Sequence, residues 1–134
     1  MTYNRQEANK ELVIRFNREF LEQGDFAVLN QLIDPDFINR TPFHGTRTVE
    51  SLIMFNRWLH ESLNGIQIEM KEIVSEDDMV ASRKIIKGTH TGNITGHQPG
   101  EEACFQVMDF IRVQRGRCLE YWSVDDFKYE LQYS

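Results

Sequence analysis

The sequence contains little cysteine, no long apolar run and no excess of basic residues. Its two cysteines, Cys104 and Cys118, cannot form a disulfide framework, and no Cys-x-x-Cys motif or closely spaced histidine pair indicates a zinc site. No run of ~18 apolar residues could span a bilayer, and residues 1–10 lack the apolar core of a secretory signal. The 15 Lys and Arg against 21 Asp and Glu give a formal charge of -6 and no basic stripe for nucleic acid. These absences predict a cytoplasmic protein with no metal, no nucleic-acid partner and no membrane partner.

The apolar residues that are present suffice for one folded domain. The chain has 134 residues and 40% hydrophobic content. We therefore expect a single domain over residues 1–134 that buries a core without metals or disulfide bonds. Apolar residues recur at three- and four-residue steps and predict helices at 4–23, 25–33 and 49–63. Alternating or β-branched segments predict strands at 37–39, 66–70, 79–91, 104–113 and 118–127. This order predicts an α+β fold, in which three N-terminal helices back a curved antiparallel sheet and enclose a pocket with it.

The last two predicted strands allow a register prediction. A three-residue loop at 114–116, with Gly116 in the left-handed region, would pair Val113 with Arg117. The apolar face of this hairpin would then carry the pairs Asp109–Tyr121, Val107–Ser123 and Phe105–Asp125. On the opposite face Cys118 would lie about 26 Å from Cys104, at ~3.3 Å per residue, which excludes a disulfide within the hairpin.

Asp109 is the most informative candidate for chemistry, because it is a carboxylate on a strand face that is otherwise apolar. Desolvation there would raise its pKa toward the range that suits general acid or base catalysis. The structural interpretation is that Asp109 is tied to Arg83, Tyr121 or a backbone amide and only orders the pocket wall. The residues alone leave both interpretations open.

Other candidates share this predicted pocket. Asp125 lies on the same face, where a second carboxylate would push the two pKa values apart, or it simply meets water at the end of its strand. Arg83 could neutralise an enolate or carboxylate. Alternatively, it could form a salt bridge or extend its guanidinium into solvent. His90 could reach the pocket rim. We expect a pocket between helices and sheet to be lined in part by apolar side chains, and we expect at least half of the aromatic ones to be core residues. The candidate apolar lining residues are Phe16, Phe37, Trp58, Phe105 and Val107.

Several short motifs, taken in order, resemble one family over nearly the whole chain. They are Asn9-Lys10, Gly24-Asp25, residues 36–39, residues 88–92 with Gly96 and Pro99, residues 109–113, Gly116-Arg117, and residues 120–122 with Val124 and Asp125. In this order they resemble a SnoaL-like protein, from the polyketide-cyclase or ester-cyclase branch of the nuclear transport factor 2-like superfamily. The resemblance implies a cone-shaped, barrel-like α+β fold, dimers or tetramers, and a pocket at the open end.

The resemblance also implies where the chemistry lies. In the cyclases that the chain resembles, an Asp directly after the Trp position near the end of the last strand is the acid/base of an aldol closure, without metal or cofactor. That position is Ser123 here, and a second polar position on the preceding strand is Asp109. A hydroxyl with a pKa far above neutral cannot replace a carboxylate as a base. We therefore expect any proton transfer to fall to Asp109, helped by Asp125, with Arg83 or Tyr121 holding the developing oxyanion.

Three functional classes remain open at this stage, because a fold alone does not determine a function. The first is a cofactor-free enzyme acting as a cyclase, isomerase, dehydratase or hydrolase, and the second is a non-catalytic binder of a small, largely apolar organic molecule. The third is an assembly module that associates through an apolar sheet face. That face would also serve a homodimer or higher homo-oligomer, and it would carry Met108, Phe110, Trp122 and Val124.

Overall fold

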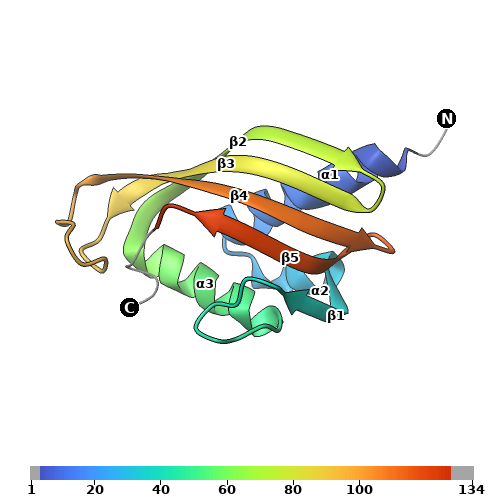
Figure 1. The fold of residues 1–134 in the computed structure, drawn as a ribbon. Coiled ribbons are helices and arrows are strands. Elements are labelled where there is room, and N and C mark those ends of the chain that lie inside the picture. The colour runs from blue at the N-terminus through green and yellow to red at the C-terminus, as the bar shows by residue number, and fades with distance from the viewer. Residues whose placement is uncertain (1–3, 128–134) are drawn as a thin grey trace.

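The computed structural model describes residues 4–127 and places helices against one side of a curved sheet (Figure 1). The helical elements are α1 (Arg5–Arg15), the π-helical segment η1 (Phe16–Glu22), the 3-10 turn η2 (Phe26–Val28), α2 (Leu29–Leu32) and α3 (Val49–Ser62). The strands are β1 (Ile33–Asn39), β2 (Leu63–Glu76), β3 (Met79–His90), β4 (Glu102–Gln114) and β5 (Arg117–Asp125). The predicted α+β class is therefore confirmed. No helix among residues 4–127 is long and apolar enough to cross a membrane.

The sheet differs from the expectation in two respects. Across residues 4–127, five strands form one open sheet in the order β1-β5-β4-β3-β2, so the barrel-like curvature does not close. The pairs β2–β3, β3–β4 and β4–β5 are antiparallel as predicted, whereas β1 runs parallel to β5. A parallel neighbour needs a long connection, and the whole chain from α3 to β4 provides it.

Local signals in the sequence explain where the helices begin. The side chain of Asn4 accepts a hydrogen bond from the Glu7 N–H at the start of α1, and Asp25 and Thr48 cap η2 and α3 in the same way. The predicted first helix continues past Arg15, but its last turns are π-helical. Apolar spacing alone does not reveal such a widened turn, because the segment has only seven residues and its buried positions 16, 17, 20 and 21 fit either helical period.

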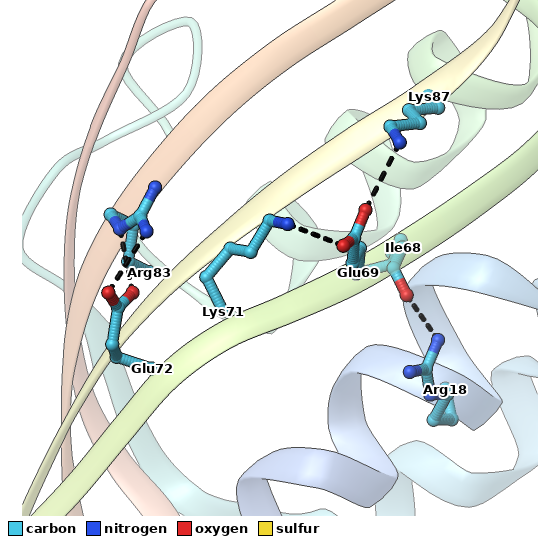
Figure 2. A network of polar contacts seen from close by, with 7 residues as sticks. All are labelled: Arg18, Ile68, Glu69, Lys71, Glu72, Arg83 and Lys87. Carbon is cyan, nitrogen blue, oxygen red and sulfur yellow. Dashed lines mark hydrogen bonds and ion pairs between the residues drawn. The ribbon is translucent and has the colours of Figure 1, made fainter.

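The free edge of β2 is covered at one point by side chains of η1. The Arg18 guanidinium donates a hydrogen bond to the carbonyl oxygen of Ile68 (Figure 2). The Ile68 N–H donates to Glu22 Oε2 at 2.6 Å. Arg18 and Glu22 also pair with each other at 3.0 Å. Two helical side chains thus take the place of a neighbouring strand at Ile68.

The two faces of strand β3 differ, because one is buried and the other carries charged side chains. Its buried side chains, on the side of the helices, are Val80, Ser82, Lys84, Ile86 and His90. On the outer side Arg83 pairs with Glu72, and Glu69 pairs with both Lys71 and Lys87 (Figure 2). Met108, Phe110 and Val124 are also exposed in the structure, by 57%, 53% and 74%. The use of this face for self-association stays a prediction.

The β4–β5 hairpin shows that the predicted register was wrong. The loop has two residues, Arg115 and Gly116, both with positive φ (52° and 73°), so Gln114 rather than Val113 pairs with Arg117. A bulge at Leu119 follows. Asp109 therefore lies opposite Ser123, Val107 opposite Asp125 and Ile111 opposite Tyr121. Because this offset is two residues, the side chains still share the predicted face.

The two cysteines are far from equivalent. Both are free, Cys104 on the surface and Cys118 in the core. Cys118 lies opposite Val113 rather than opposite the predicted Arg112. Burial, with a smaller contribution from the charge of Asp109, raises the pKa of the Cys118 thiol to about 12. A thiol in this state is not a nucleophile at neutral pH.

Candidate functional site

A cavity of about 270 Å³ lies between the helices, the segment 41–44 and the inner face of β3, β4 and β5. Apolar side chains form much of its wall, namely Phe16, Leu21, Pro42, Phe43, Leu52, Phe55, Ile86 and Val107. The polar lining residues are Asn39, Thr41, His44, Ser51, Lys84, Tyr121, Ser123 and Asp125. An apolar hollow with a few converging polar groups is the usual form of a small-molecule site.

A buried ion pair supports the sheet wall of this cavity. Lys84 Nζ lies 3.0 Å from Asp109 Oδ2, and both side chains are only 1% exposed. Ser82 Oγ donates to Asp109 Oδ1 at 2.6 Å, and the Tyr121 hydroxyl donates to Oδ2 at 3.4 Å. Asp109 thus has a charged partner and hydrogen bonds on both oxygens, which is the condition for keeping a carboxylate buried.

The π-helical segment contributes a third partner of this pair. Asn17 is fully buried, and its Oδ1 accepts a hydrogen bond from Lys84 Nζ at 2.7 Å. Its Nδ2 donates to the carbonyl oxygen of Val13 at 2.9 Å, one turn earlier. These two contacts fix the orientation of the amide and hold the Lys84 ammonium from the side of the helix.

Strand pairing places three lining residues in one row across the inner face. Lys84 lies opposite Val107 on the neighbouring strand, and Val107 lies opposite Asp125 on the next. Lys84 and Asp125 are therefore two strands apart, about 10 Å between their backbones. A ligand lying on Val107 would meet a cation at one end and a carboxylate at the other.

The pKa values of Asp125 and Tyr121 are both raised. Desolvation raises the pKa of Asp125, and nearby Asp126 adds to the shift, while the hydrogen bond that Asp125 accepts from the Phe127 N–H opposes it. Desolvation is also the largest cause that raises the pKa of Tyr121, followed by the charge of Asp109. Tyr121 therefore stays a neutral hydrogen-bond donor, whereas Asp125 gains basicity as a carboxylate.

The structure brings five of the predicted site residues to the cavity, namely Phe16, Val107, Tyr121, Ser123 and Asp125. Asp109 is buried between helices and sheet, but its carboxylate lies behind Lys84 and Tyr121 and does not line the cavity. Arg83 points to the outer face, where its guanidinium pairs with Glu72 at 2.7 Å. The prediction of an Arg83–Asp109 pair is therefore wrong, and so is that of Arg83 in the pocket.

The remaining predicted lining residues belong to packing clusters outside the cavity. Phe37 is a core side chain, and the His90 ring stacks on His97 with ring centres 4.1 Å apart. Phe105 stacks on Phe127 at 4.2 Å, and Trp58 meets the same ring edge-on at 5.3 Å. Asp125 lies opposite Val107 rather than opposite Phe105, so Phe105 lies beyond the paired end of β5.

Lys84 is the main site residue that sequence reasoning missed. The signal was present, because Lys84 shares its parity along the strand with Val80 and Ile86, whereas Arg83 has the opposite parity. The lining residues His44 and Ser51 had no comparable signal, since they lie on a loop and on α3. Among residues 4–127, no group of three or more His, Cys, Asp or Glu side chains could hold a metal ion.

The open curved sheet, its helices and the enclosed cavity define a nuclear transport factor 2-like domain. The chain belongs to the SnoaL-like polyketide cyclase family, whose sequence profile matches residues 11–131. No curated protein significantly matches the chain.

Solved structures share this fold at low sequence identity. IdmH from Streptomyces antibioticus, a candidate polyketide cyclase, is 23% identical with a TM-score of 0.78, over 88% of this chain and 91% of that one. A candidate polyketide cyclase from Bacillus cereus is 21% identical with a TM-score of 0.79, over 93% and 78% of the two chains. TsrD from Streptomyces laurentii is 19% identical with a TM-score of 0.78, over 93% and 92%. At these identities the likeness supports the fold alone.

Proposed function

We propose that this protein binds a small, largely apolar organic molecule and catalyses a cofactor-independent proton transfer on it, with Asp125 as the acid/base. The observation that carries the proposal is an apolar cavity that has the Asp125 carboxylate, with a raised pKa, on its solvent-exposed side and hydrogen-bond donors further in. Membership of the SnoaL-like polyketide cyclase family is consistent with this chemistry. A cyclase or isomerase of this kind needs only positioned acid, base and oxyanion donors.

Asp125 suits the role better than Asp109 or Ser123. The oxygens of Asp109 are hydrogen-bonded to Ser82, Lys84 and Tyr121 and lie behind the wall of the cavity. Ser123 lines the cavity at the position where the resembled cyclases carry their Asp, but its hydroxyl is not a base at neutral pH. Asp125 is two residues further along β5 on the same face, so the strand can supply a carboxylate to the same cavity.

The proposed step is proton abstraction next to a carbonyl group. Asp125 takes a proton from the carbon, the C–H electron pair forms a C=C bond, and the C=O π pair moves onto oxygen. The Tyr121 O–H, kept neutral by its raised pKa, would turn from its long 3.4 Å contact with Asp109 to donate toward that oxygen. Return of the proton to another position gives isomerisation, and attack of the enolate on a second carbonyl gives cyclisation.

Hydrogen–deuterium exchange tests this step before any natural substrate is known. We expect the protein to accelerate exchange of the α-protons of 1-tetralone in D₂O, followed by ¹H NMR. The Asp125→Asn variant should lose about 100-fold of the enzyme-dependent rate, because positioned acid–base catalysis contributes at least that much. Asp77→Asn is the matched control, since Asp77 lies on the exposed turn between β2 and β3 and does not line the cavity. An Asp125→Asn protein with an unchanged rate contradicts the proposal.

A non-catalytic binder is the second candidate, and one observation favours it. Asp109, the carboxylate deepest in this region, is fully occupied by protein partners and so stabilises the wall rather than reacting. A protein that binds 1-tetralone, detected by ligand-observed NMR, but leaves its exchange rate at the buffer value would support this candidate.

A further inference from the structure

We infer that Lys84, held by Asp109 and Asn17, forms a carbonyl-binding subsite that accepts a neutral ketone or ester oxygen and discriminates against a carboxylate. This inference deepens the proposed function, because it names the class of ligand that the cavity takes. It assigns a binding role to Lys84, and it assigns positioning roles to Asp109 and Asn17, which do not line the cavity.

The first step of the argument is the number of donors on the ammonium group. A lysine ammonium has three N–H donors. In the described part of the chain, Lys84 Nζ has two hydrogen-bond acceptors, Asn17 Oδ1 at 2.7 Å and Asp109 Oδ2 at 3.0 Å. Lys84 also lines the cavity. No described residue accepts from the third donor, so a ligand acceptor that reaches the exposed 1% of the side chain would complete its hydrogen bonds.

The second step is that the donor cannot turn away easily. One acceptor is on the π-helical segment and the other on β4, so the ammonium is held from two elements. Asn17 is oriented in turn by the Val13 carbonyl, and Asp109 by Ser82. A donor held in place before the ligand arrives loses little entropy on binding, and it is stronger in a site from which water is excluded.

The third step is the charge of the cluster. The positive charge of Lys84 is balanced by Asp109, while Asn17, Ser82 and Tyr121 are neutral. A ligand carboxylate would therefore bring an unbalanced negative charge between apolar walls, and Asp125 on the same side of the sheet would repel it. A neutral carbonyl oxygen gains the charge-assisted hydrogen bond and adds no charge.

The row across the sheet fixes how such a ligand would lie. With its carbonyl oxygen at Lys84, the ligand would rest on Val107 and extend toward Asp125 on the next strand. The carbon next to the carbonyl would then point toward the proposed base. Charge that develops on the oxygen during proton removal would strengthen the contact to Lys84, so the subsite stabilises the transition state more than the bound ground state.

Three probes of one shape test the inference. They are 2-acetylnaphthalene, its hydrocarbon isostere 2-isopropenylnaphthalene, and 2-naphthoate, with Kd measured from naphthalene fluorescence. We expect the ketone to bind about tenfold more tightly than the hydrocarbon, the increment of one hydrogen bond to a charged group, and the carboxylate to bind most weakly. Equal binding of ketone and hydrocarbon, tightest binding of the carboxylate, or no binding of any probe would overturn the inference.

The test variant removes both charges together, because Lys84→Met alone leaves Asp109 buried without a partner. Lys84→Met/Asp109→Asn should bind ketone and hydrocarbon equally, with circular dichroism confirming the fold. Lys87→Met, the same substitution on the outer face of the same strand, should keep the tenfold preference. A preference that persists in the double variant contradicts the role of Lys84.

The exchange assay separates this inference from the proposed function. If Asp125-dependent exchange of 1-tetralone is observed but the ketone preference is absent, the subsite is wrong and the catalytic proposal stands. If the ketone preference depends on Lys84 but no exchange occurs, the subsite stands and the protein is a carbonyl-selective binder.

Discussion

Two adjacent residues of β3 show how strongly position determines what an ion pair does. Arg83 pairs with Glu72 on the outer face (Figure 2), and the two side chains are 35% and 62% exposed. Lys84 pairs with Asp109 on the inner face, where both are 1% exposed. Water and salt screen the outer pair, so removing either partner has little effect on the stability of the protein. The inner charges depend on each other, and this dependence makes Lys84 available as a fixed, desolvated donor.

The largest expected effect breaks the inner pair. We expect Lys84→Met to lower the free energy of unfolding by about 3–5 kcal/mol, because it leaves the buried Asp109 carboxylate without its cation. Arg83→Met, one residue away, should leave the urea midpoint almost unchanged. Equilibrium urea unfolding at pH 7 measures both. If Lys84→Met and Arg83→Met lost equal amounts of unfolding free energy, the inner and outer ion pairs would not differ in their contribution to stability.

Removing both inner charges sharpens the same comparison. We expect Lys84→Met/Asp109→Asn to recover most of the stability lost by Lys84→Met, because the neutral amide can still accept from Ser82 and no unpaired charge remains. The double-mutant cycle in urea gives the coupling energy between the two side chains. A double variant that is less stable than Lys84→Met would contradict the account of a desolvated pair.

The smallest expected effect concerns Asp125, which lacks a cationic partner in the described residues. Its pKa is raised above the usual 3.8, chiefly by desolvation, so the folded state holds this proton more tightly than the unfolded state. The resulting stability is present below pH 3.8 and is lost as the pH rises through the folded-state pKa. Relative to Asp125→Asn, the wild-type protein should therefore lose stability between pH 3.5 and pH 7 in urea titrations. A stability difference between the wild-type protein and Asp125→Asn that does not vary with pH, or in which the wild-type protein gains stability as the pH rises, would contradict this prediction.

The sequence predicted which segments form which elements, and the errors have specific causes. Apolar spacing identified α1 with its continuation and α3, and the content of Val, Ile and Thr identified β3 to within a residue. Such patterns state which side of a strand is buried but not the direction of its neighbour, so the parallel β1–β5 pair was not predicted. The hairpin register failed because Arg115 adopts positive φ beside Gly116, which an arginine seldom does.

The site was predicted less completely than the fold, for reasons of distance along the chain. Five candidate residues line the cavity, and the common face of the four on β4 and β5 followed from the predicted hairpin. The partner of Asp109 comes from β3 and the second acceptor of Lys84 from the π-helical segment, 67 residues away in sequence. Neither pairing follows from local spacing. Parity along β3 was the one available signal, and it favours Lys84 over Arg83.

The Arg18 and Glu22 contacts to Ile68 have a consequence for how copies of the protein can meet. At this point of β2 both main-chain groups are already engaged, so a foreign strand cannot dock there and lengthen the sheet into a fibre. Any association at this edge would have to displace two helical side chains first. The edge of β2 is thus protected against strand addition at Ile68.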